Sequence, residues 1–160
     1  MTDYKLLAAQ IRSLAEDEPN YIPVMSNASA LLYENMEDLN WAGFYLLSPA
    51  RPDLLVLGPF QGRTACIEIP VGRGVCGTAV AREASVVVPD VHAFPGHIAC
   101  DSASESEIVV PIRKNGRIVG VLDLDSPKKN TFGEEDRAGL ETFVRILADA
   151  LPDDFPARLL

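Results

Sequence analysis

Cysteine and long apolar runs are both scarce in this chain. Its 160 residues contain three cysteines, which are too few for a fold held by disulfides. The N-terminal segment MTDYKLLAAQIRSLAEDEP has acidic residues and helical periodicity in place of the basic start and continuous apolar core of an export signal. No stretch approaches the roughly 18 apolar residues that span a bilayer. We therefore expect a cytoplasmic protein, in a reducing compartment and not in a membrane.

Basic residues are also few. The chain has 14 Lys and Arg against 23 Asp and Glu, for a formal net charge of -9. Nucleic-acid binding depends on the neutralisation of phosphates by basic side chains, so nucleic acid is not an expected partner. A chain of this length buries a core without a structural metal or disulfides, and we expect one domain over residues 1–160.

Apolar periodicity predicts helices at both ends of the chain. Leu7, Ile11 and Leu14 recur at helical spacing, and a second helix is expected from about residue 23 to 39. A closing helix is expected over residues 133–151. The Pro-containing tail that follows, PDDFPARLL, is expected to be frayed.

The middle of the chain predicts strands. They are followed in sequence by the closing helix, and this order indicates an α+β domain with a central antiparallel β-sheet. The N- and C-terminal helices would cover one face of the sheet and loops would cover a ligand on the other. The β-prone runs lie at 41–47, 53–60, 65–71, 85–88 and twice between 106 and 125, with Asn115-Gly116 as a strong hairpin signal between the last two.

Two carboxylates share one face of the last predicted strand. In the run VLDLD, Asp123 and Asp125 are two residues apart and project the same way. Exposed acids on strands are ordinary, so a solvated outer face is the simplest interpretation. The position of Glu107 on the preceding strand distinguishes this interpretation from a binding site.

The register of this hairpin is open. A two-residue turn would place Ile108 opposite Asp123 and turn Glu107 to the other face. A three-residue loop, Lys114-Asn115-Gly116, or a bulge near Pro111 would instead place Glu107 opposite Asp123. Three like charges would then repel one another, and either a proton or a cationic ligand, such as an ammonium group, would relieve the repulsion.

The segment GRGVCG at residues 72–77 matches the pattern G-x-G-x-x-G. A dinucleotide site would need the alternating strands and helices of a parallel sheet, which this chain lacks. The glycines are expected to form a tight turn that presents Cys76.

The cysteines and histidines lack metal-ligand spacing. No C-x-x-C or H-x-x-x-H pair occurs, so no metal is expected. Cys66 lies in a run predicted to be a strand, where a thiol packs as an inert apolar group, and Cys76 is ambiguous. Cys100 lies in the aperiodic stretch from Pro89 to Ser106, and a long loop of this kind is often functional. Cys100 is therefore the candidate nucleophile, whereas His92 and His97 receive no role.

Four segments carry a family resemblance, namely NWAGFYLL, LVLGPFQGRTACIEIPVGRGVCGTAVA, DVHAFPGHIACDSASESEIVVPI and GVLDLDSP. Together, over roughly Ser29 to Phe143, they resemble the free methionine-R-sulfoxide reductases, which have the GAF fold. The resemblance implies that Cys100 attacks the substrate and that Cys66 and Cys76 are resolving or recycling thiols.

The same resemblance implies a substrate pocket and a reaction. The pocket would consist of Trp41, Tyr45, Glu107, Asp123 and Asp125. Free methionine-R-sulfoxide would be reduced through a sulfenic acid and a disulfide, and a thioredoxin-type dithiol would restore the thiols without any other cofactor. A homodimer is also implied. The alternative is a GAF sensor that binds a small molecule or responds to redox state without catalysis.

Overall fold

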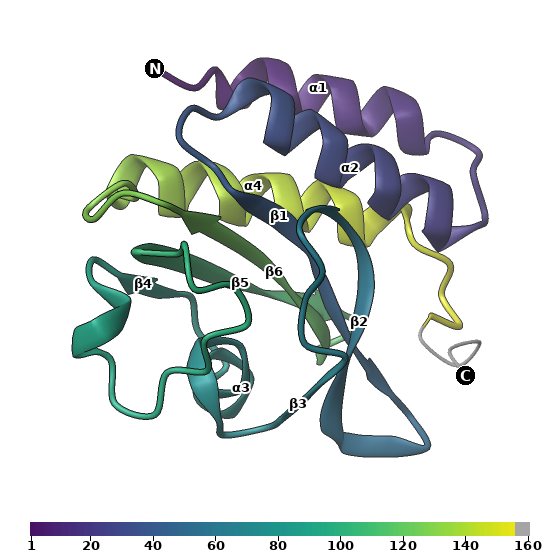
Figure 1. Ribbon diagram of the computed structural model, residues 1–160. Helices are drawn as coiled ribbons and strands as arrows, with labels where there is room; N and C mark the ends of the chain where they lie inside the picture. The colour runs from purple at the N-terminus through teal and green to yellow at the C-terminus, as the bar shows by residue number, and fades with distance from the viewer. Residues whose placement is uncertain (156–160) are drawn as a thin grey trace.

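A computed structural model of the protein describes residues 1–155, and these form one layered α+β domain (Figure 1). Its centre is a six-stranded antiparallel sheet in the order β3-β2-β1-β6-β5-β4. The predicted fold class is thereby confirmed. The strands are β1 (Trp41–Ser48), β2 (Arg51–Gly62), β3 (Glu68–Pro70), β4 (Val86–Val88), β5 (Ser106–Lys114) and β6 (Arg117–Ser126).

Three long helices lie on one side of the sheet: α1 (Tyr4–Ala15), α2 (Tyr21–Asn35) and α4 (Glu134–Ala150) (Figure 1). The side chain of Asn20 caps α2, which therefore begins before the predicted residue 23. Pro23 is tolerated in this first turn because its missing N–H would have no partner within the helix. Of the residues with helical spacing in α1, Leu7 and Ile11 are buried, whereas Leu14 is 45% exposed and its neighbour Ala15 is buried.

The shorter helix α3 (Gly74–Arg82) lies on the opposite side of the sheet (Figure 1). The glycine-rich segment before it forms the predicted tight turn, in which the Gly72 N–H donates to the Gly77 carbonyl at 2.8 Å. A Cβ atom at Gly77 would lie 2.4 Å from the Pro70 carbonyl oxygen, so this turn requires glycine there. Cys66 lies outside β3, which is shorter than the predicted strand at 65–71.

The β5–β6 hairpin has a two-residue turn and a bulge. Asn115 and Gly116 have φ values of 53° and 76°, as a type I′ turn requires, so the three-residue loop was wrong. After the Arg113–Ile118 pair, the register shifts by one residue before Ile112 pairs with Gly120. This shift, next to Pro111, is the bulge that the sequence analysis gave as the alternative.

The bulge decides which side chains share a face. Because side chains alternate along a strand, one extra residue moves every later side chain of β6 to the other face. Glu107 consequently pairs with Asp125, and Asp123 pairs with Val109. The expectation that Glu107 stands directly opposite Asp123 was wrong by two residues, but all three carboxylates do lie on one face.

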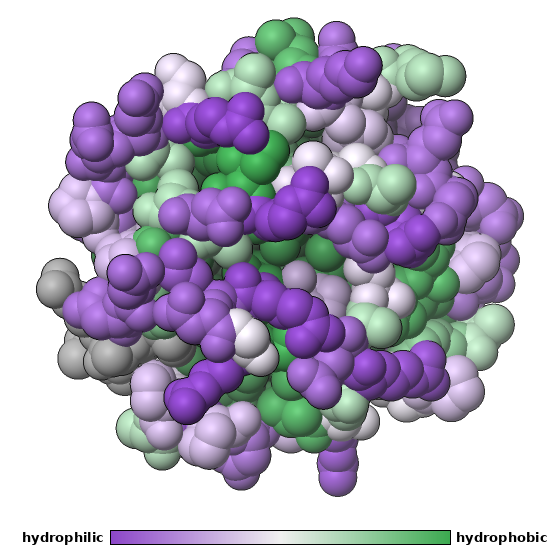
Figure 2. Space-filling view, turned by 180° about the vertical axis from the view of Figure 1, so that it is seen from behind, coloured by the Kyte–Doolittle hydropathy of each residue, from purple (hydrophilic) through white to green (hydrophobic). Residues whose placement is uncertain are grey.

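The sheet separates two apolar clusters. On the side of the long helices, Leu122 and Leu124 pack with α1, α2 and α4. On the other side, Val109 and Val121 pack with Trp41, Tyr45 and α3. Because these clusters are buried, the face of the molecule seen in Figure 2 is mostly hydrophilic, with apolar residues visible between the polar ones.

The residues after α4 are ordered as far as the structure describes them. Phe155 is 6% exposed, and its ring lies 5.3 Å from that of Tyr21. Burial of this aromatic ring places the chain against α2 at Phe155, and the frayed tail stays a prediction. The rest of that predicted tail, 156–160, lies outside the described residues. Among those that are described, no helix has the length and apolar character needed to cross a membrane.

Candidate active site

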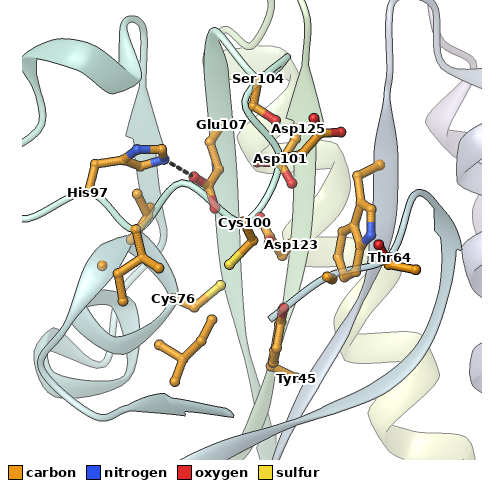
Figure 3. A pocket seen from close by; sticks show the side chains of 16 residues that line it. Tyr45, Thr64, Cys76, His97, Cys100, Asp101, Ser104, Glu107, Asp123 and Asp125 are labelled. Carbon is orange, nitrogen blue, oxygen red and sulfur yellow. Dashed lines mark ion pairs between the residues drawn. The ribbon is translucent and has the colours of Figure 1, made fainter. Parts of the chain in front are cut away.

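A pocket opens on the side of the sheet away from the long helices (Figure 3). Its walls come from β1, β5, β6 and α3, and from two covering segments, one before β3 and one between β4 and β5. Its volume is about 40 Å³, which is room for a few water molecules and far below the roughly 300 Å³ of common ligand sites. All eight residues predicted from the sequence except Cys66 line it, namely Trp41, Tyr45, Cys76, Cys100, Glu107, Asp123 and Asp125.

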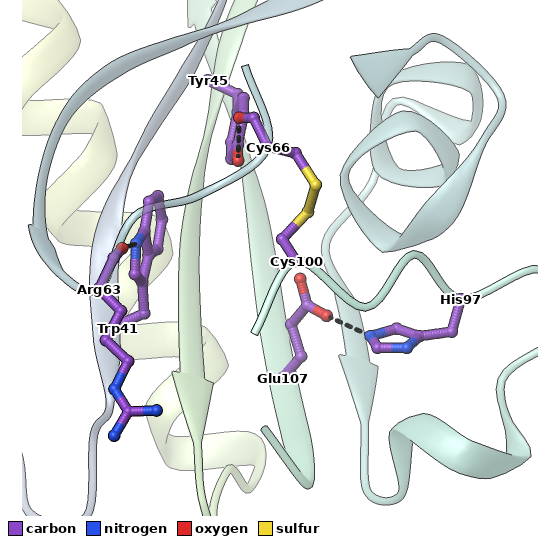
Figure 4. The surroundings of a disulfide bond; sticks show 7 residues. All are labelled: Trp41, Tyr45, Arg63, Cys66, His97, Cys100 and Glu107. Carbon is purple, nitrogen blue, oxygen red and sulfur yellow. Dashed lines mark hydrogen bonds and ion pairs between the residues drawn. A yellow bond between two sulfur atoms is a disulfide. The ribbon is translucent and has the colours of Figure 1, made fainter. Parts of the chain in front are cut away.

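A disulfide joins the two covering segments across the pocket. Cys66, before β3, is bonded to Cys100, in the long loop between β4 and β5, and their Cα atoms are 5.3 Å apart (Figure 4). From the sequence alone, the disulfide partner of Cys100 was either Cys66 or Cys76. The third, Cys76, is free and only 3% exposed.

The carboxylates are buried, so the solvated-face interpretation is wrong. Glu107 and Asp123 are each 6% exposed, and Asp125 is partly buried. Burial is the main cause that raises the pKa of each of the three carboxyl groups, and repulsion from a neighbouring carboxylate raises each pKa further. Oδ1 of Asp123 is buried without a hydrogen-bond partner. The pocket therefore favours a proton or a cation.

The same environment acts on Cys76. Burial, followed by the charges of Asp123 and Glu107, raises the pKa of its thiol well above the ordinary value. The Cys76 thiol is consequently a weak source of thiolate in the empty pocket. Its sulfur and one oxygen each of Glu107 and Asp123 lie within 4.8 Å of one another, and this group has the chemistry to hold a metal ion.

Aromatic rings form one wall of the pocket. The Trp41 ring stacks with those of Tyr45 and Phe60, with centroid separations of 5.8 and 5.2 Å. The indole Nε1 donates to the Arg63 carbonyl at 3.1 Å, and the Tyr45 hydroxyl donates to the Cys66 carbonyl at 2.8 Å (Figure 4). Both side chains are thus fixed in orientation where they line the pocket.

His97 is a site residue that the sequence analysis missed. Its Nε2 lies 3.4 Å from Oε1 of Glu107, and the two side chains are 14% and 8% exposed (Figure 3). Burial lowers the pKa of His97. The only sequence signal was its place in the loop that carries Cys100, because no local periodicity relates this loop to β5. His92, by contrast, is exposed and pairs with Glu105 outside the pocket.

Asp101 and Ser104 were also missed. Both line the pocket and accept hydrogen bonds from the Asn40 amide, at 3.1 and 3.2 Å. These bonds hold the loop that carries Cys100 to the residue before β1. Asp101 follows Cys100 directly and adds a fourth acid to the pocket.

Comparison with known proteins gives consistent matches. The family model described as GAF domain matches residues 26–151. The free methionine-R-sulfoxide reductase of Escherichia coli (strain K12) is 52% identical over 148 residues, which cover 92% of this chain and 88% of that protein.

Two solved structures are similar over nearly the whole chain. The reduced form of fRMsr of Staphylococcus aureus has a TM-score of 0.89 at 52% identity, with 95% of this chain and 97% of that one covered. The free methionine-R-sulfoxide reductase from Neisseria meningitidis, in complex with its substrate, has a TM-score of 0.87 at 47% identity, with 92% and 87% covered.

Proposed function

The chain belongs to the GAF-domain family and, within it, to the free methionine-R-sulfoxide reductases, and we propose that it reduces free L-methionine-(R)-S-oxide to methionine with its own thiols. The observation that carries this proposal is the meeting of Cys100 with three carboxylates and an aromatic wall in one pocket. Each part of the substrate finds a complementary group there.

The carboxylates would bind the substrate's ammonium group. Glu107, Asp123 and Asp125 share one face, and Oδ1 of Asp123 is buried without a hydrogen-bond partner in the described residues. An ammonium supplies that partner, whereas a methionine within a peptide has an amide at this position and leaves the acids unpaired. Trp41 and Tyr45 would enclose the methyl sulfoxide end.

In the first chemical step, the Cys100 thiolate attacks the sulfoxide sulfur and the sulfoxide oxygen takes up a proton. Oxygen passes to the cysteine sulfur, so that a thiol and a sulfoxide become a sulfenic acid and a thioether. A carboxyl group with a raised pKa is a suitable proton donor at neutral pH, and Glu107 and Asp123 both meet this condition. The acids also disfavour a thiolate beside them, and the bound ammonium offsets this effect.

In the second step, the sulfenic acid condenses with a thiol and releases water. The Cys66–Cys100 bond supports Cys66 as that thiol. An external dithiol of the thioredoxin type would then restore both thiols by exchange. Reduction also frees the loop that carries Cys100 from the segment before β3, which allows the small pocket to open for substrate. We further propose that the enzyme needs no other cofactor and that it is a homodimer in the cytoplasm.

The test follows methionine release with dithiothreitol as the reductant. Free methionine sulfoxide in its R and S epimers is compared with N-acetyl-methionine-R-sulfoxide, which differs from the substrate mainly in the missing ammonium charge. We expect turnover of the free R epimer and a loss in kcat/KM of about a hundredfold on acetylation, since two charge-assisted hydrogen bonds at about 1.5 kcal/mol each are lost.

Three outcomes contradict the proposal. Binding without any methionine release would favour a GAF sensor. Equal turnover of the acetylated substrate would remove the acids from ammonium recognition. Retention of activity by Cys100→Ser would exclude Cys100 as the nucleophile.

A further inference from the structure

Cys76, Glu107 and Asp123 meet at the floor of the pocket from three different elements, α3, β5 and β6. Each offers one ligand atom, and the three atoms lie within 4.8 Å of one another. The three residues are 3%, 6% and 6% exposed. None of them takes part in the disulfide, so the group is complete without any change in the covering segments (Figure 3).

An independent feature indicates that a cation belongs there. Oδ1 of Asp123 is buried and makes no hydrogen bond. A buried carboxylate oxygen without a partner is costly, and a cation removes that cost. The substrate's ammonium is one such cation, but it makes no use of the sulfur among the three ligand atoms. Thiolate, carboxylate and imidazole together are ligands that Zn²⁺ prefers.

We propose that Cys76, Glu107 and Asp123 form a binding site for a thiophilic divalent cation such as Zn²⁺, and that the ion inhibits the enzyme by occupying the position of the substrate's ammonium. Nothing in the catalytic proposal requires this ion. The inhibition rests on the proposed function, whereas the binding of the ion does not.

The geometry suits a tetrahedral ion. Bonds of about 2.0 to 2.3 Å to one Zn²⁺ place the ligand atoms roughly 3.3 to 3.8 Å apart, so side-chain rotation is sufficient to draw the three atoms together. A water molecule can take the fourth position, as at zinc sites with three protein ligands, because His97 lies outside the group of three. The charge of the ion favours the deprotonated thiol and carboxyl groups, and binding therefore releases protons.

Binding is tested with Co²⁺ on the full chain, because cobalt bound to a thiolate gives a characteristic sulfur-to-metal absorption. The variant Cys66→Ser/Cys100→Ser keeps Cys76 as its one thiol and has no disulfide. We expect this variant to bind one Co²⁺ with the sulfur absorption, and Zn²⁺ to displace it. Addition of Cys76→Ser should abolish the absorption and weaken Co²⁺ binding at least tenfold. Circular dichroism checks that each variant is folded.

The chain offers a matched control. Asp90, His92 and Glu105 form a second group with ligand atoms within 4.8 Å, on the surface. We expect His92→Gln to leave the Co²⁺ signal unchanged. A folded variant that has Cys76 but gives no sulfur absorption would overturn the proposal, and so would an absorption that survives Cys76→Ser but disappears with His92→Gln.

Inhibition is measured separately on the reduced wild-type enzyme. Zn²⁺ should raise the apparent KM for free methionine-R-sulfoxide without lowering kcat, and a chelator should restore the original KM. Inhibition of kcat alone would contradict a shared position for metal and ammonium. If Co²⁺ binds through Cys76 but the enzyme releases no methionine, the proposed function fails and the metal site stands. If the enzyme releases methionine but Co²⁺ gives no sulfur absorption, the metal site fails and the proposed function stands.

Discussion

The Cys66–Cys100 disulfide should stabilise the folded protein by an amount that depends on the number of residues between the two cysteines. The two cysteines are 34 residues apart. A cross-link that closes a loop of this length lowers the entropy of the unfolded chain enough to stabilise the folded protein by about 4 kcal/mol. Reduction of the bond should remove this contribution.

The expected shift in melting temperature follows from the size of the protein. An unfolding entropy of about 2.1 cal/mol/K per residue converts 4 kcal/mol into a shift of about 12 °C for this chain. The assay is differential scanning calorimetry on protein oxidised with free methionine-R-sulfoxide, before and after treatment with a phosphine reductant. We expect the oxidised protein to melt at the higher temperature.

Variants identify the bond that causes the shift. A Cys76–Cys100 bond would close a loop of similar length, so the size of the shift alone does not distinguish the two pairings. Cys66→Ser should abolish the difference between oxidised and reduced protein, and Cys76→Ser should preserve it. The opposite pattern, or a wild-type difference below about 2 °C, would refute the pairing or the entropic reasoning.

Three further predictions concern the pocket. The pKa of Asp123 is raised in the folded protein, so folding favours its protonated form, and without substrate the stability should fall as pH rises above about 4. In thermal melts, Asp123→Asn should flatten this dependence, whereas the control Asp53→Asn, at an exposed site, should not. His97→Ala should lower kcat about tenfold and alter its pH profile if the 3.4 Å contact between His97 and Glu107 contributes about 1.4 kcal/mol to catalysis. An unchanged profile would exclude a role for His97. Gly77→Ala should lower the urea midpoint of unfolding because the new Cβ meets a backbone carbonyl at 2.4 Å, and equal midpoints would contradict the close turn.

Local patterns were sufficient for most of the fold. Helical spacing predicts a helix at α1, and the closing helix expected over 133–151 is α4. The Asn115-Gly116 pair predicts the type I′ turn because both positions need positive φ. The alternation of a strand also places Asp123 and Asp125 on one face. Each of these features depends on residues that are close in sequence.

The sequence by itself therefore determined the elements, the sharing of a face by two acids and the place of Cys100 in a long loop. Only the tertiary structure decided that Glu107 joins those acids, because a single bulged residue in β6 reverses the face of every side chain beyond it. It also decided that Cys100 pairs with Cys66 and that His97 meets Glu107. The disulfide joins residues 34 positions apart, and no local periodicity relates His97, in an aperiodic loop, to Glu107 on β5.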